Sequence, residues 1–257
     1  MEVYLLENLY IGILVFVRFV GFFIIAPIFA NQVIPNRIKL SICLLMSIIL
    51  TPLVNQIDFA LPEYLLVFVA QIIVEFLIGF MIGFIMLLVF LAIQLAGEFI
   101  DRRMGFFLAN VMDPQHGLQV PLIGQFKNIL AILFFFAIDA HHYLLKTVVD
   151  SFEIVELTNL DVSEQFLAAM LRTVGDLFPI ALRIAFPVMA TLFIVDLAFG
   201  LVARTVPQMN VFIIGLPTKI LIGLILLGVS MANYFTYLEF LISDTFEKIY
   251  QILNLIG

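Results

Sequence analysis

Charged residues are scarce in this sequence, and their scarcity decides the class of protein. Of the 257 residues, 12% are charged and 64% are hydrophobic, and the mean hydropathy is +1.19. Soluble domains average about 25% charged and about 45–50% apolar residues, so this composition cannot cover a water-exposed surface. Several apolar runs reach the roughly 20 residues that span the hydrocarbon core of a bilayer. The sequence therefore predicts an integral membrane protein.

Residues that usually carry chemistry are also scarce. Cys43 is the only cysteine, which excludes intrachain disulfide bonds and thiolate metal sites. His116, His141 and His142 lack the spacing of a helical metal site, and the sequence has neither a Gly-x-Ser-x-Gly elbow nor a Gly-x-x-x-x-Gly-Lys phosphate loop. The net charge of −7 gives no support for nucleic-acid binding. We expect no catalysis, no metal and no cofactor.

Six apolar stretches are present, separated by polar segments. No alternating apolar–polar pattern is evident, so bundled helices are favoured over a transmembrane barrel. The stretches cover about 9–30, 38–54, 64–97, 128–145, 177–203 and 211–238. Lysine and arginine near the ends of the stretches predict that the first, third and fifth loops are cytoplasmic and that the N-terminus lies outside. Because the chain starts with an acid and not with a basic segment, we expect no cleaved leader.

The third stretch is too long for one ordinary span. As a continuous helix it would be about 50 Å long. It therefore either tilts and projects from the membrane or breaks near Gly79 and Gly83, which form a Gly-x-x-x-Gly step suited to close helix packing.

An amphipathic helix is expected within the acidic fourth loop. The run Asp161-Val162-Ser163-Glu164 has the spacing of a capping box, with Glu164 at the third helical position. The residues that then fall on one face are Phe166, Leu167, Met170, Leu171 and Val174. This helix either docks on a partner or rests at the membrane interface.

Four charges lie inside apolar stretches: Arg18, Glu75, Arg183 and Asp196. A charge at the centre of a membrane helix costs about 2.5–3.5 kcal/mol on insertion scales, so each should be buried against protein, water or an opposite charge. Ion pairs that fix helix register are the favoured interpretation. Lining of a wet conduit and a proton or ion relay remain open, and the sequence does not say which charges pair.

Two loops have unusual content. Residues 106–120 are rich in phenylalanine, methionine and leucine, with glycine and proline on either side. Such a segment would expose a large apolar patch in water, so it is either a deformable seal or a loop buried against neighbouring helices. The second loop runs from Pro207 to Lys219 and has prolines near both ends, at 207 and 217. It predicts a tight hairpin between two apolar helices.

These features occur in the order typical of a known family. Residues 97–101, the Asp113-Pro114 turn, residues 181–187 and the hairpin at 207–219 together resemble the FliR family. The start of the chain fits as well, with Arg18 before Gly21 and Pro27, then Pro35 with Lys39. The resemblance covers nearly the whole chain. It implies an all-α, polytopic membrane fold with broken helices, a FliP-like part at about 1–175, and a FliQ-like hairpin with a C-terminal helix at about 176–257, within one export-gate domain over 1–257.

The resemblance also implies a function, partners and a location. The chain would be a non-enzymatic subunit of the flagellar type III export gate in the bacterial inner membrane, at the flagellar basal body. It would form a conduit for unfolded export substrates with FliP-like and FliQ-like subunits, and an FlhB-like subunit would wrap the cytoplasmic side. Because the family assembly lies partly above the bilayer, apolar helices can bury against one another instead of lipid, which revises the simple six-span topology.

The resemblance assigns roles to specific residues. The channel plug would comprise Phe106, Phe107, Leu108, Met112, Asp113 and Pro114, with Gly105 and Gly117 as its hinges. The FliQ-like turn would comprise Pro207, Gln208, Asn210, Pro217 and Lys219. Three alternatives stay open: an injectisome subunit, a secondary transporter with a midplane ion site at Glu75 or Asp196, and a membrane scaffold without pore contact.

Overall fold

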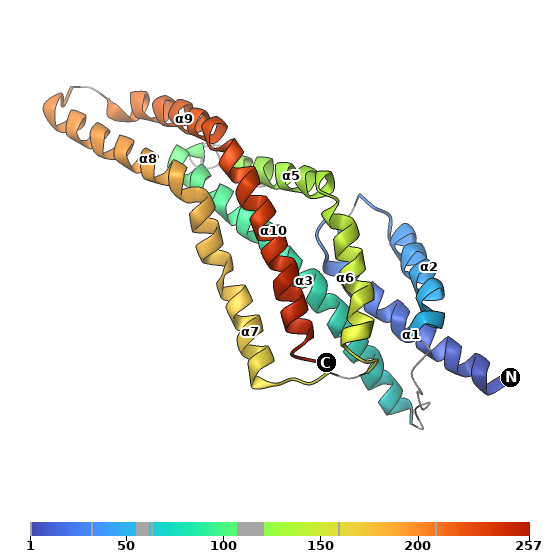
Figure 1. Ribbon diagram of the computed structural model, residues 1–257. Coiled ribbons are helices and arrows are strands. Elements are labelled where there is room, and N and C mark those ends of the chain that lie inside the picture. The colour runs from blue at the N-terminus through green and yellow to red at the C-terminus, as the bar shows by residue number, and fades with distance from the viewer. Residues whose placement is uncertain are drawn as a thin grey trace. The chain divides into compact units, whose positions relative to one another are not determined.

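Helices make up the regular structure of the chain. The computed structural model describes residues 2–31, 33–54, 62, 64–106, 121–158, 160–208 and 210–257 (Figure 1). The helices are α1 (Glu2–Ile25), α2 (Asn36–Val54), α3 (Leu65–Met104), α5 (Leu122–Ala137), α6 (Ala140–Ile154), α7 (Glu164–Gly175), α8 (Leu177–Thr205), α9 (Val211–Val229) and α10 (Met231–Leu253). No strand occurs within these ranges, and the predicted all-α class is confirmed.

The helices have the length and composition of membrane spans. Four described helical segments qualify alone, and the number rises to as many as 6 if α5 with α6 and α9 with α10 each form one broken span. The prediction of a polytopic membrane protein with about six apolar helical stretches is confirmed. The predicted stretches 128–145 and 211–238 each contain one of these breaks, at residues 138–139 and at Ser230.

Helix α3 runs without a break for 40 residues, which corresponds to about 60 Å. A break near Gly79 and Gly83 is therefore wrong, and the alternative of one long helix holds. Gly97, which we placed at the start of a loop, lies inside α3, and the helix continues to Met104. Within the most apolar window of α3, 67% of the residues are buried, against 17% in α2. Helix α3 is thus a core element, whereas α2 is peripheral.

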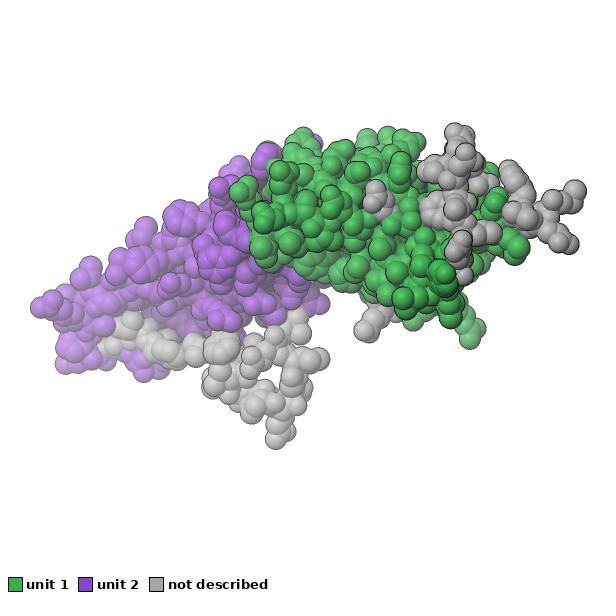
Figure 2. All heavy atoms as spheres, turned by 90° about the horizontal axis from the view of Figure 1, so that it is seen from below, with its two compact units in different colours: residues 1–88, 138–174, 242–257 green, residues 89–137, 175–241 purple. Residues whose placement is uncertain are grey.

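Two compact units divide the chain (Figure 2). The first unit comprises residues 1–88, 138–174 and 242–257, which include α1, α2, α6 and parts of α3 and α10. Its fully buried side chains include Leu14, Phe19, Phe22, Ile78 and Leu144. Three segments far apart in sequence therefore build one core.

The second unit comprises residues 89–137 and 175–241. It contains the C-terminal part of α3, α5, α8, α9 and the start of α10. Phe135, Ala185 and Leu192 are fully buried in it. Helices α8 and α9 lie side by side as a hairpin (Figure 1), joined by residues 206–210.

Helix α7 confirms the expected amphipathic helix, but it starts later in the sequence than predicted. The helix begins at Glu164, and the Ser163 hydroxyl accepts a hydrogen bond from the Phe166 backbone N–H at 3.2 Å. Ser163 is therefore the N-cap and not Asp161, and the predicted capping box is wrong because the third helical residue is now Phe166, which has no side-chain acceptor. Leu167, Leu171 and Val174 are exposed and form the apolar face.

Candidate functional site

Arg18 and Glu75 form an ion pair that is completely buried in the first unit. The Arg18 Nε donates to Glu75 Oε2 at 2.6 Å, and both side chains are 0% exposed. Arg18 lies on α1 and Glu75 on α3, so the pair joins the two longest elements of this core. Two opposite charges in contact allow each other to be buried where either alone would be costly.

The other nitrogens of the Arg18 guanidinium are bound by the end of α6. Nη1 donates to the backbone oxygen of Ser151 at 2.9 Å and to its hydroxyl at 3.0 Å, and Nη2 donates to the Val155 carbonyl at 3.5 Å. The ring centroid of Phe152 lies 4.0 Å from the Arg18 Cζ, in the range of a cation–π contact. Arginine suits this position because its fixed fork of donors reaches several acceptors at once.

The second carboxylate oxygen of Glu75 binds the segment after α6. Glu75 Oε1 accepts a hydrogen bond from the backbone N–H of Thr158 at 2.7 Å. Thr158 has a φ of 67°, an unusual conformation for a β-branched residue. Conformations of this kind persist only where surrounding contacts impose them, and here Glu75 supplies such a contact. The ion pair thus fixes α1, α3, α6 and the turn that follows.

Small residues bring α1 and α3 close enough for this pair to form. A methyl group at Gly79 would overlap the backbone carbonyl of Arg18, and one at Gly21 would overlap the carbonyl of Phe76. A methyl group at Gly83 of the Gly-x-x-x-Gly step would press against the Ile25 side chain and the backbone N of Ala26. The step therefore serves helix packing, the simpler of its two possible roles.

A second ion pair joins α8 to α9 in the other unit. The Lys219 ammonium binds the Asp196 carboxylate, and the two side chains are 25% and 30% exposed. Asp196 thus pairs within the hairpin, and Lys219, which the resemblance placed in the turn, lies inside α9. Pro217, which we interpreted as a loop boundary, is also inside α9. The turn is therefore shorter than predicted and contains Pro207, Gln208 and Asn210, all exposed.

Arg183 differs from the other three embedded charges. It lies on α8 beside the buried residues Ala181, Ile184 and Ala185, but its own side chain is exposed. Its expected burial is wrong for this chain by itself. The physical reason is its position on the helix, since residues 181, 184, 185 and 188 form the inward face.

The two helix ends on either side of the segment 106–120 are held together in the second unit. Asp101, near the end of α3, is 5% exposed, and its carboxylate accepts hydrogen bonds from the Ile123 N–H at 3.1 Å and the Gly124 N–H at 3.4 Å. These N–H groups belong to the first turn of α5. One carboxylate therefore caps α5 and holds together the two helix ends that flank the loop.

Two glycines reinforce this contact. A methyl group at Gly97 of α3 would overlap the backbone of Gly124 in α5, so the helices touch backbone to backbone. Gly105, directly after α3, has a φ of 89°, which favours glycine, and Phe106 is partly buried. The remaining predicted plug residues, Phe107, Leu108, Met112, Asp113, Pro114 and the hinge Gly117, lie outside the described residues.

Comparison with known proteins finds a family that matches nearly the whole chain. The family described as "Bacterial export proteins, family 1" matches residues 9–245. The chain belongs to this family. The resemblance of the sequence to the FliR family is also confirmed, because several relatives that match nearly the whole chain are FliR proteins.

Three relatives show how far the likeness to this export family extends. The flagellar biosynthetic protein FliR of Bacillus subtilis is 36% identical, with 95% of each chain covered. The FliR protein of Pectobacterium carotovorum is 32% identical, over 93% of this chain and 91% of its own. That of Escherichia coli is 28% identical, over 89% and 87%.

Lys127 is a buried cation of this export-family chain that sequence reasoning missed. It is 2% exposed on α5, and its Nζ lies 4.1 Å from the ring centroid of Tyr234, whose hydroxyl donates to the Lys127 carbonyl at 2.9 Å. The pair joins α5 to α10 within the second unit. The predicted apolar stretch 128–145 begins one residue after Lys127, so hydropathy alone does not place Lys127 on a buried helix face. Asp101 was missed for the same reason.

The adjacent histidines lie at the break between α5 and α6. Asp139, His141 and His142 place one possible ligand atom each within 4.8 Å of one another, and the two histidine rings are 4.0 Å apart. The two rings therefore lie closer together than neighbouring positions on a regular helix would place them. Asp139 and His142 are well exposed, 3.5 Å apart, and sit at the start of α6, an ordinary arrangement for a helix terminus.

Proposed function

We propose that this chain is a membrane subunit of the flagellar protein-export apparatus and forms, with other subunits, a conduit for unfolded export substrates. Its family is one of bacterial export proteins, and relatives covering nearly its full length are flagellar biosynthetic proteins. The chain is accordingly a flagellar export component with membrane-spanning helices. Its expected location is the bacterial inner membrane at the flagellar basal body, and its role there is non-enzymatic.

The observation that carries the conduit proposal is the clamped base of the loop. The contact of Asp101 with Ile123 and Gly124 holds the ends of α3 and α5 together, so the segment 106–120 is attached at both ends to a fixed support. A loop with fixed ends can move as a unit without unfolding its neighbours. In this proposal Phe106, Phe107, Leu108 and Met112 exclude water from the closed conduit, and Asp113 and Pro114 form its turn.

The hinges of the plug are the two glycines on either side. Gly105 already has a backbone conformation that other residues adopt at a cost, so it can redirect the chain where α3 ends. Gly117 would serve the same purpose before α5. Hydrophobic constrictions of this kind block ions by dewetting and open when their side chains separate.

Partner subunits are supported by the surface of the second unit. Phe186, Ile194 and Leu201 on α8, together with Ile213, Leu221 and Ile225 on α9, are all exposed. The exposed Arg183 lies on the same helix as the first three, and a charge within a membrane-spanning helix is costly where it faces lipid. We infer that FliP-like and FliQ-like subunits cover these helices and meet Arg183 with an acid or with water. An FlhB-like subunit would contact the cytoplasmic side.

The transporter alternative loses support from the geometry. Its two candidate ion-binding carboxylates are engaged, Glu75 by Arg18 and Thr158, and Asp196 by Lys219. A midplane site needs carboxylates that can coordinate a transported ion. The injectisome alternative is disfavoured because the named relatives belong to flagella.

Crosslinking to a stalled substrate tests the proposal. A photoreactive residue replaces Phe107 in the loop, and a matched control replaces Leu171 on the exposed face of α7. A stalled, unfolded export substrate should crosslink at position 107 and much less at position 171. Crosslinks of equal strength at both positions, or none at 107 in an exporting cell, would show that the loop does not line the conduit.

A further inference from the structure

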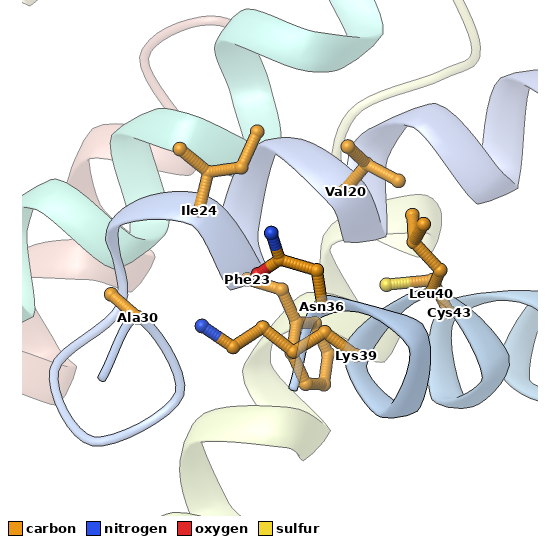
Figure 3. Close-up of a pocket in the computed structure, with 8 residues that line it drawn as sticks. All are labelled: Val20, Phe23, Ile24, Ala30, Asn36, Lys39, Leu40 and Cys43. Carbon is orange, nitrogen blue, oxygen red and sulfur yellow. The ribbon is translucent and has the colours of Figure 1, made fainter. Parts of the chain in front are cut away.

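A pocket of about 360 Å³ lies between the end of α1 and the start of α2, within the first unit (Figure 3). Its volume is within the range of small-molecule sites. The lining residues are Val20, Phe23, Ile24, Ala30, Asn36, Lys39, Leu40 and Cys43. All are apolar or nearly so except Asn36 and Lys39, which share one face of the first turn of α2. The pocket therefore has an apolar wall and one polar, cationic side.

The charge at this pocket has a single sign. No aspartate or glutamate occurs between Glu7 and Asp58, whereas Lys39, at the start of α2, lines the pocket. Figure 3 shows the Lys39 side chain extended across the pocket beside Asn36. The positive end of the α2 dipole lies at the same place and favours an anion. A ligand of this pocket should therefore carry a negative group.

The apolar wall continues out of the pocket along α2. Leu40, which lines the pocket, is followed at helical spacing by Leu44 and Ile48, and all three are about half exposed or more. An elongated hydrocarbon chain can follow this stripe, whereas a free phosphate or a small polar anion would leave it empty. The ligand should thus combine an anionic head with a long apolar tail.

We propose that this pocket binds an anionic phospholipid. The Lys39 ammonium and the Asn36 amide hold the phosphate, and one acyl chain lies against Val20, Ile24 and Leu40 before it runs along α2. The start of α2 belongs to the first loop of the predicted topology, which should face the cytoplasm, where anionic lipids attract lysine and arginine at the ends of membrane spans. The bound lipid would cover the peripheral helix α2 and tie it to α1.

Native mass spectrometry with defined lipids tests this inference. The chain is purified in mild detergent with its co-purifying subunits and titrated with phosphatidylglycerol, with phosphatidylcholine of equal chain length, and with inorganic phosphate. Phosphatidylglycerol should be retained most strongly. Lys39→Gln should weaken its binding about fivefold, since one lysine near a membrane surface contributes about that factor. Lys39→Arg should retain binding.

Two further variants separate the pocket from general surface charge. Arg37→Gln removes the same charge on the same helix turn but outside the pocket, so it should bind as the unchanged protein does. Ala30→Phe should fill the pocket and abolish retention without any change in charge. Size-exclusion chromatography establishes that each variant is folded before it is measured.

The inference fails if phosphatidylcholine binds equally well, if inorganic phosphate alone displaces the lipid, or if Arg37→Gln weakens binding as much as Lys39→Gln. Photoactivatable phosphatidylglycerol gives an independent result. Its crosslinks should fall on residues 20–43. A crosslink from a partner subunit to this segment, with none from lipid, would show that a protein helix occupies the pocket.

Discussion

Arg18 and Glu75, separated by 57 positions in the sequence, meet in a contact from which solvent is excluded on both sides. The turn at Thr158 and the end of α6 complete the contact. Four segments of the first unit therefore depend on one ion pair. Removal of one partner would leave a buried charge without compensation, whereas removal of both would leave no buried charge but only a packing defect and the Thr158 N–H without its acceptor.

A double-mutant cycle should reveal this dependence. Arg18→Met and Glu75→Leu should each lower the free energy of unfolding by about 3–5 kcal/mol, and the double variant should lose less than the sum. The measurement is thermal stability in detergent together with the yield of folded protein. Arg183→Met is the matched control, because Arg183 is exposed and its replacement should leave the isolated chain as stable as before. Additive losses for Arg18 and Glu75 would show that the two charges do not act together.

Gly79 should tolerate no side chain. Gly79→Ala places a methyl group against the Arg18 carbonyl, so α1 and α3 must separate, at a cost of about 1–3 kcal/mol for an overpacked core. Gly200→Ala is the control, since no atom lies within 4 Å of a methyl group there and alanine favours the helix. The comparison is the melting temperature of the two variants. An unchanged value for Gly79→Ala would contradict the close approach of the two helices.

Much of this architecture follows from composition and hydropathy. The membrane class, the all-α fold and the six stretches depend on local sequence, because each span is a continuous apolar run. The need of Arg18 and Glu75 for partners was also predictable from their apolar surroundings. Their pairing with each other was not, since the linear sequence holds no information on which charges meet across 57 positions.

The errors share a physical cause. Gly97 and the charges after it suggested the end of a helix, yet α3 continues to Met104 because Gly97 packs against Gly124 of α5. Asp101 consequently lies inside the helix as a buried cap of α5, and not in a loop. Thr158 carries no local signal of its positive φ, which tertiary contacts impose. Arg183 was misplaced because hydropathy does not distinguish the inward face of a helix from the outward face.

Asp101 should control the start of α5. In Asp101→Ala the N–H groups of Ile123 and Gly124 lose their acceptor, at a cost of about 0.5–2 kcal/mol for a lost cap. Hydrogen exchange at these two amides should accelerate, while exchange in α9 should not. Asp101→Asn retains one acceptor oxygen, so its exchange rate should lie between those of the unchanged chain and of Asp101→Ala. Protection equal to that of the unchanged chain in Asp101→Ala would show that the carboxylate does not hold the loop base.

Exchanging the two charges of the Asp196–Lys219 pair should preserve its effect. Asp196→Lys and Lys219→Asp should each lower the yield of complex with co-expressed partner subunits, and their combination should restore it, because the attraction survives the exchange. The effect on the isolated chain should be small, up to about 1 kcal/mol, since both side chains are partly exposed. No recovery in the double variant would mean that partners recognise the individual charges and not the pair.

The central claim is that residues 106–120 seal a conduit, and ion flux across membranes carrying the assembled complex tests it most directly. Residues 105–117 are deleted and replaced by a short linker, while Asp101 and α5 stay intact so that the loop base survives. Co-purification of the partner subunits first establishes that the complex has assembled. Our account predicts that the resting membrane becomes leaky to small ions while some export persists. A conductance equal to that of the unchanged complex would contradict it and would show that the loop is merely packed against its neighbours.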